Sequence, residues 1–168
     1  MAMRLRPYYR NAAVRYAHRW AYHRNPAFYE FSELGGDCTN FVSQCIYAGS
    51  GVMNFTPTFG WYYINANEKT PAWTGVQYLN DFLLREKASV GPKAELVGLE
   101  ALEIGDVIQL SFQGIAYQHT ALVVAVSGDA EPDQILVAAH SIDADYRPLS
   151  TYDYQSVRCL HIIGTLIP

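Results

Sequence analysis

Three segments in the first half of the chain carry apolar residues at helical spacing. The first covers residues 7–23, and its aromatic stripe predicts a helix that ends before Pro26. The second begins after Asp37 and stops at Gly49, and the third covers residues 72–87. Their apolar faces are Tyr9, Ala13, Tyr16 and Trp20; Phe41, Val42, Cys45 and Ile46; and Trp73, Val76, Leu79 and Leu83. These patterns predict three amphipathic helices.

Short apolar runs separated by turn residues replace the helical spacing in the second half. They predict four strands, at residues 107–112, 120–126, 135–139 and 159–166. Residues 88–104 are expected to connect, with a helical stretch at 99–103, and residues 50–72 to form a long irregular loop. Helices followed by closely spaced strands indicate an α+β fold in which N-terminal helices pack on an antiparallel sheet. At this length, a single domain over residues 1–168 is expected.

The composition is that of a globular protein, with 50% hydrophobic and 17% charged residues. A net charge of −4 gives no reason to expect a nucleic acid or an anionic membrane as partner. The sequence has no apolar run of about eighteen residues, so no transmembrane segment is expected. Residues 1–7 lack the apolar core of a signal peptide. This predicts a cytoplasmic location for the chain as it stands, and a secreted or cell-envelope location if a leader has been removed.

Cys38 falls at the predicted start of the second helix, with Asp37 in the capping position. Unpaired N–H groups and the helix dipole favour a thiolate there, and the thiolate is the nucleophilic form of cysteine. Cys45 lies on the apolar face of the same helix and is expected to be core. Three cysteines do not make a disulfide framework, and Cys38 and Cys45 are roughly 10 Å apart along a helix. Cys38 is therefore a candidate nucleophile, with a structural cysteine as the alternative.

Two histidines are candidates for the base that would accept the Cys38 proton and for the group that orients this base. His119 stands at the mouth of one predicted strand, and His140 stands at the end of the next. In an antiparallel hairpin these two positions are neighbours, so His140, Ser141 or Asp143 is expected beside His119. A nucleophile, a base and a polar group that orients the base form the arrangement of papain-type catalysis. A zinc site built from the same histidines and cysteines matches no common ligand spacing, so neither a metal nor an organic cofactor is expected.

Aromatic and polar residues around Cys38 are candidates for substrate contact. A long aromatic loop such as residues 50–72 is typical of a groove wall or lid. The backbone N–H of Cys38 is the expected first donor to an oxyanion, with Tyr29 or Ser32 as candidates for the second. The predicted substrate-binding residues are Tyr29, Asn40, Trp61, Tyr62 and Trp73, although Asn40 also suits a structural bond to neighbouring loops.

Four stretches share the order and spacing of a known family. They are residues 9–17, the motif GGDCTNFVSQC at residues 35–45, residues 105–110, and the His119 strand followed by residues 137–143. The chain resembles the putative amidase domain family, a bacterial branch of the papain-like cysteine hydrolases related to the NlpC and CHAP peptidases. The resemblance implies a papain-like α+β fold of the NlpC/CHAP type, with Cys38 as nucleophile and His119 as base. The third catalytic position maps to His140, with Asp143 as its rival.

The residues and the resemblance together predict a cysteine amidase or peptidase. It would act on a peptide or small amide substrate through a thioester acyl-enzyme, and the resemblance adds cell-wall peptides as a substrate class. Two alternatives stay open. The same three residues could transfer the acyl group to an acceptor other than water, or the domain could be a catalytically silent module that binds peptide or glycan with its aromatic loop.

Overall fold

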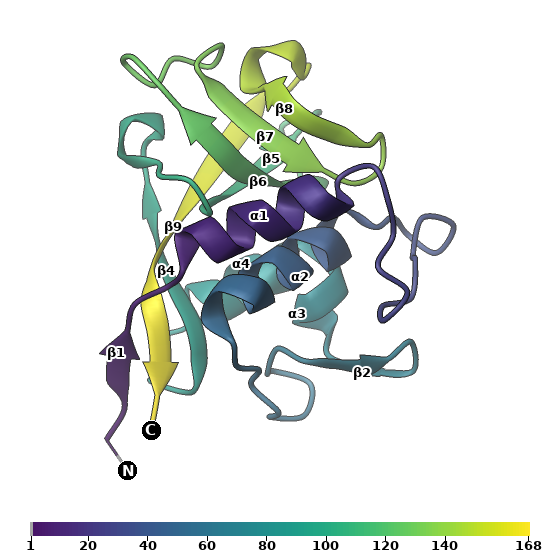
Figure 1. Cartoon of the computed structure of the whole chain (residues 1–168), viewed down its shortest axis with the longest axis vertical. Helices are drawn as coiled ribbons and strands as arrows, with labels where there is room; N and C mark the ends of the chain where they lie inside the picture. The colour runs from purple at the N-terminus through teal and green to yellow at the C-terminus, as the bar shows by residue number, and fades with distance from the viewer. Residues whose placement is uncertain (1) are drawn as a thin grey trace.

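Helices pack on an antiparallel sheet in the computed structural model, which describes residues 2–168 (Figure 1). The helices are α1 (Arg10–Trp20), α2 (Cys38–Ser50), α3 (Pro71–Thr74) and α4 (Val76–Leu83), with 3₁₀ turns η1 (Leu99–Ala101) and η2 (Leu149–Thr151). The seven strands of the sheet are β1 (Arg4–Arg6), β4 (Gly91–Val97), β5 (Val107–Ser111), β6 (His119–Val126), β7 (Ile135–Ala139), β8 (Ala144–Pro148) and β9 (Ser156–Ile167). A separate hairpin is formed by β2 (Tyr63–Asn65) and β3 (Glu68–Lys69). The predicted α+β class with an antiparallel sheet is confirmed.

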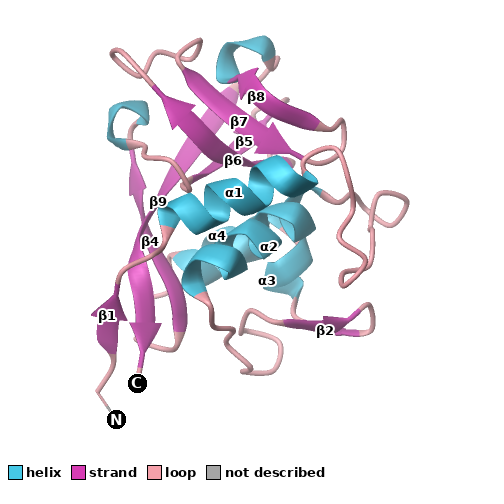
Figure 2. Cartoon of the chain, viewed as in Figure 1, coloured by secondary structure: helices cyan, strands magenta, loops and turns pink. Residues whose placement is uncertain are grey.

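The last strand, β9, holds the sheet together. The strands follow the order β1-β9-β5-β6-β7-β8, and β4 also pairs with β9. Cys159 and Leu160 pair with β5 and with β4, so these two strands lie on opposite edges of β9. Figure 2 shows β9 running the length of the sheet, with the helices beside it. Near its end β9 also pairs with β1.

Alternate residues of the central strands point to two separate apolar cores. In β6, Leu122 and Val124 belong to the core shared with α1 and α2. Ala121 and Val123 belong to a second core on the opposite face, which Leu149 of η2 helps to close. Because both faces are covered, the strands read as continuous apolar runs, and this made β5, β6 and β7 recognisable in the sequence.

Several predicted boundaries are corrected by the structure. The helix expected over residues 72–87 is two helices, α3 and α4, because Gly75 between them is extended, with φ −111° and ψ 130°. Residues 88–104 were expected to connect, but they contain β4. β4 begins with Gly91 and Pro92, and its apolar and polar residues do not alternate regularly. It therefore forms a strand only through its pairing with β9.

Candidate active site

The exposed thiol of the chain stands at the first residue of α2. Cys38 is partly exposed, whereas Cys45 and Cys159 are buried, and all three are free thiols. The turn before it contains Gly35 and Gly36, whose φ values of +92° and +102° lie in the left-handed region that favours glycine. The one hydrogen bond of the Cys38 sulfur within residues 2–168 is with Thr39 Oγ1, at 3.7 Å. Cys38 is thus the thiol that solvent reaches most easily.

Asp37 occupies the N-cap position of α2, but its side chain does not cap the helix. Its carboxylate instead accepts hydrogen bonds from the Phe31 N–H at 2.9 Å and the Asn40 Nδ2 at 2.8 Å. It also lies 2.6 Å from His140 Nδ1. Burial raises the pKa of Asp37, but the hydrogen bonds from His140, Phe31 and Asn40 outweigh it and hold the pKa below its usual value. The predicted capping role is corrected: Asp37 fixes the preceding loop and leaves the helix end uncapped.

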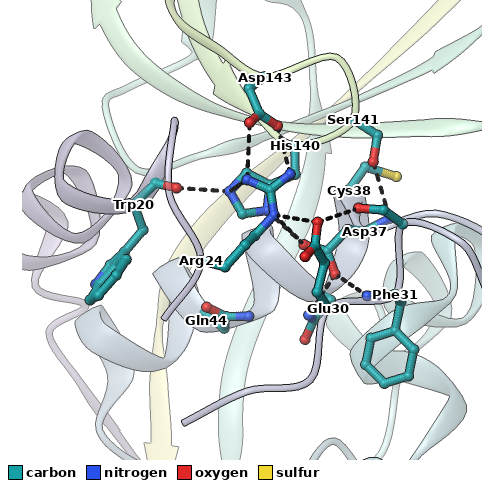
Figure 3. Close-up of polar contacts among 12 residues, drawn as sticks. Trp20, Arg24, Glu30, Phe31, Asp37, Cys38, Gln44, His140, Ser141 and Asp143 are labelled. Carbon is teal, nitrogen blue, oxygen red and sulfur yellow. Dashed lines mark hydrogen bonds and ion pairs between the residues drawn. The ribbon is translucent and has the colours of Figure 1, made fainter. Parts of the chain in front are cut away.

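His140 and Asp143 lie in a polar network behind Asp37 (Figure 3). His140 Nδ1 faces the Asp37 carboxylate, and its Nε2 lies 2.8 Å from the Trp20 carbonyl oxygen. The same Nε2 also lies 3.3 Å from Arg24 Nη1, so both ring nitrogens of His140 have partners within this network. Asp143 accepts two hydrogen bonds from Arg24, at 3.0 and 2.9 Å.

The third catalytic residue predicted from the sequence, His140 or Asp143, stays a prediction, and the hydrogen bonds of both candidates lead away from His119. Within residues 2–168, neither His140 nor Asp143 forms a hydrogen bond to His119, the contact through which either would orient that ring. Ser141, the other candidate, accepts from the Asp37 N–H at 3.3 Å. These side chains turn instead toward other partners: His140 toward the Asp37 carboxylate, Ser141 toward the Asp37 N–H, and Asp143 toward the Arg24 guanidinium.

His119 begins β6 and is joined to the start of α2 through its neighbour. Thr120 Oγ1 lies 2.9 Å from Thr39 Oγ1, so one hydrogen bond links the residue after His119 with the residue after Cys38. The His119 side chain is 8% exposed, and its Nε2 has no hydrogen-bond partner among the described residues. Burial, and secondarily the charge of Arg147, lowers the pKa of His119 to about 4. The ring is neutral near pH 7 and is a base.

Two further residues lie at this site that the sequence did not reveal. The Tyr152 ring is 5.5 Å from the His119 ring between centroids, and the Arg147 guanidinium lies 3.6 Å from the centre of the Tyr152 ring. Burial raises the pKa of Tyr152, Arg147 lowers it, and a charge on Cys38 raises it. Residues 144–155 carry no local pattern of a functional motif, so only the pairing of β8 with β7 brings them here.

Two of the predicted substrate-binding aromatics belong to the core instead. Trp61 and Trp73 are fully buried, with ring centroids 4.7 Å apart. Their indole N–H groups donate to Ser43 Oγ at 3.1 Å and to Asn40 Oδ1 at 3.0 Å, both on α2. The amide of Asn40 also donates to Asp37 and to the Tyr29 carbonyl. The substrate-binding predictions for Trp61 and Trp73 are corrected, because polar side chains on α2 supply the acceptors that a buried indole needs. For Asn40 the structure shows the alternative, a structural bond to neighbouring loops.

A pocket of about 520 Å³ lies alongside the turn that leads to Cys38. Tyr29, which is 47% exposed, forms part of its wall, and its contact with a substrate stays a prediction. Tyr62 packs against Phe55, with ring centroids 5.4 Å apart, and does not line this pocket. The remaining lining residues are Phe31, Leu34, Gly35, Gly36, Ala66, Asn67, Lys69 and Thr74.

Within residues 2–168, no three His, Cys, Asp or Glu side chains gather in a way that would hold a metal ion. Over the same residues, every helix is too short or too polar to cross a membrane.

The lowered pKa of His119 makes the folded protein sensitive to acid. The unfolded chain, with a pKa of 6.5 for this histidine, binds the proton more strongly than the folded chain, where the pKa is about 4. The contribution of neutral His119 to the free energy of unfolding is therefore fully present above about pH 6.5. It is lost as the pH drops toward 4, by roughly 3 kcal/mol in total. Urea unfolding at about pH 7 and about pH 4.5 measures this loss.

A His119→Gln variant should lose most of that dependence, because Gln does not titrate. His23→Gln is the matched control, since His23 is exposed, and it should keep the wild-type dependence. Equal acid sensitivity in wild type and His119→Gln would contradict the assignment of the effect to His119.

The fold and the site define an α+β protein with a reachable thiol and a buried neutral histidine at the junction of a helix and a strand. The chain belongs to the putative amidase domain family, whose sequence profile matches residues 7–163. Membership indicates an activity of the hydrolase type. The chain is also 34% identical over 148 residues to the uncharacterized protein YhbB of Bacillus subtilis (strain 168). This alignment covers 87% of the chain and 45% of YhbB. The chain thus spans less than half the length of that relative. No solved structure matches the chain.

Proposed function

We propose that the chain is a cysteine-dependent amide hydrolase of the papain-like type, related to the NlpC and CHAP peptidases, in which Cys38 is the nucleophile and His119 the base. The observation that carries the proposal is the hydrogen bond between Thr39 and Thr120, which ties the start of α2 to the start of β6. It supports the proposal because the residues next to it in the chain are a partly exposed thiol, at the start of the helix, and an unpartnered histidine, at the start of the strand. Membership of an amidase family agrees with this chemistry.

The reaction divides into two steps. Cys38 Sγ attacks the carbonyl carbon of an amide while the neutral His119 ring accepts the thiol proton. The C–N bond then breaks, His119 returns the proton to the leaving amine, and a thioester remains on Cys38. A water molecule deprotonated by His119 next attacks the thioester, which releases the carboxylic acid and restores the thiol.

The uncapped end of α2 supports the stabilisation of the oxyanion. The Asp37 carboxylate is turned toward Phe31, Asn40 and His140, so it does not occupy the first N–H groups of the helix. The Cys38 N–H is then the donor that a tetrahedral intermediate needs, and the helix dipole adds to its effect. The pocket beside Gly35 and Gly36 has the size for a peptide or small amide, and the family resemblance favours cell-wall peptides.

The proposal is tested by alkylating the protein with iodoacetamide and measuring each cysteine by mass spectrometry across a range of pH. In wild type, Cys38 should react much faster than Cys45 and Cys159. Exposure alone would also produce that order, so the deciding comparison is His119→Gln against the control His23→Gln. His119→Gln should slow the alkylation of Cys38 by about tenfold or more near neutral pH, because the base is lost.

The proposal fails if Cys38 reacts at the same rate in His119→Gln and in wild type. If Cys38 is activated and an amide of the panel is cleaved, the product formed in the presence of added amines distinguishes acyl transfer, which gives a new amide, from hydrolysis, which gives the acid.

A further inference from the structure

Two enclosed polar atoms at the candidate site lack hydrogen-bond partners. They are His119 Nε2 and Tyr152 Oη, and neither is bonded within residues 2–168. The two rings face each other at a tilt of 37°, with centroids 5.5 Å apart. Buried polar groups are nearly always paired, so two orphans side by side call for an explanation, and a catalytic role is one of the common ones.

The Tyr152 ring is held firmly in this place. Arg147 stacks over it, with the guanidinium carbon 3.6 Å from the ring centre. Arg147 is itself fixed by Thr151, which accepts from its Nε at 2.8 Å through Oγ1 and from its Nη2 at 3.0 Å through the carbonyl. The Tyr152 ring, directly after η2, is thus held next to the His119 ring by its stacking with Arg147.

The rival partners of His119 are already engaged. Both ring nitrogens of His140 are taken up by Asp37 and by the Trp20 carbonyl. Asp143 is bound to Arg24 through both of its oxygens. The Tyr152 hydroxyl forms no close hydrogen bond, and its one polar neighbour, the Arg147 side chain, is a donor that leaves the phenolic oxygen a second lone pair.

We propose that Tyr152 is the positioning residue of His119, with Nε2–H donating a hydrogen bond to the phenolic oxygen. The inference rests on the proposed function and replaces the third residue expected from the sequence. The bond is not formed in the structure, where the ring centroids are 5.5 Å apart, and the proposal requires the His119 side chain to rotate toward the Tyr152 phenol. A proton kept on Nε2 leaves Nδ1 as the base for the Cys38 thiol, which is the role of the polar partner in papain-type sites.

The charged and titratable groups around this pair come from three elements. Arg147 reaches in from β8, the Tyr152 phenol from the segment after η2, and the Cys38 thiol from the start of α2. Arg147 disfavours a protonated His119, so the ring depends on a neutral hydrogen-bond partner rather than on a carboxylate.

The variant that tests the inference is Tyr152→Phe, which keeps the ring under Arg147 and removes only the hydroxyl. Tyr154→Phe is the matched control, two residues along the same segment and outside the site. Nitrogen-15 NMR reads the tautomer of His119 directly. We expect a single Nε2–H tautomer in wild type and Tyr154→Phe, and a mixture of tautomers in Tyr152→Phe.

The second readout is the pH dependence of Cys38 alkylation by iodoacetamide. Tyr152→Phe should react about tenfold more slowly near neutral pH, which is the effect of losing one hydrogen bond to a polarised group, and Tyr154→Phe should match wild type. A change confined to folding would alter neither the tautomer nor the shape of this profile.

The inference is overturned if Tyr152→Phe keeps both the wild-type tautomer and the wild-type alkylation profile. It is also overturned if wild-type His119 carries its proton on Nδ1, a result that needs no variant and so does not depend on the folding of Tyr152→Phe. In either case the proposed function stands as long as His119→Gln slows alkylation. If His119→Gln has no effect, the proposed function fails first.

Discussion

A Cys38→Ser variant is expected to lose amide-bond cleavage by a factor of roughly 10³ or more. The hydroxyl is a far weaker nucleophile than the thiolate, and loss of the nucleophile from a site that works as a unit removes nearly all of its chemistry. The assay measures release of the amine from a panel of peptide and small amide substrates, with the most active substrate then used for kinetics. Loss of kcat with little change in KM is expected, because the sulfur acts mainly in the transition state.

Cys159→Ala is the control for this experiment. Cys159 is a free thiol in the second core, away from the site, so its removal should leave kcat/KM near the wild-type value while lowering stability slightly. Undiminished turnover by Cys38→Ser would rule out Cys38 as the nucleophile. Equal loss in both variants would indicate a folding defect instead.

An Asp37→Ala variant is expected to lose about 3–5 kcal/mol of unfolding free energy near neutral pH, the usual result of breaking a buried charged pair from one side. Asp37 is 1% exposed and His140 is 2% exposed, so His140 Nδ1 would stay buried without its hydrogen-bond partner. The Phe31 N–H and the Asn40 amide would lose their acceptor as well. Chemical denaturation measures the change.

Asp153→Ala is the matched control, because Asp153 is exposed and should change stability by less than about 0.5 kcal/mol. Asp37→Asn should fall between the two, since it keeps an acceptor for the backbone N–H and loses the charge. A loss below about 1 kcal/mol in Asp37→Ala would show that the network with His140 contributes little to folding.

The parts of the fold that the sequence predicted are those whose signal is local. The apolar face of α2 and the mainly apolar runs of β5, β6 and β7 are visible in the local sequence, and the predicted positions agree with the structure within a few residues. β4 and β8 were missed because they are edge strands whose partners, β9 and β7, are remote or irregularly paired. Their backbone bonds, not their side-chain patterns, make them strands.

The candidate site shows the same division. Cys38 and His119 were singled out because the residues around each of them are unusual for a core segment. The nearness of His140 to Asp37 rather than to His119 depends on which way one side chain turns at the end of β7, and a sequence does not contain that information. Trp61 and Trp73 were taken for groove residues because they lie in or next to a long aromatic loop, yet both indoles are buried and their hydrogen-bond acceptors come from α2.

The position of β9 also determines when this protein can fold during synthesis. Residues 156–167 supply the partner for β1, β4 and β5, so three strands made earlier wait for the last one before the sheet can close. Such long-range pairing is slow, and the helices and the β6–β7 hairpin must persist meanwhile with their apolar faces uncovered. A ribosome-bound chain that stops before residue 156 should therefore remain sensitive to proteases and bind chaperones, while one that extends well beyond residue 167 should acquire resistance in a single step.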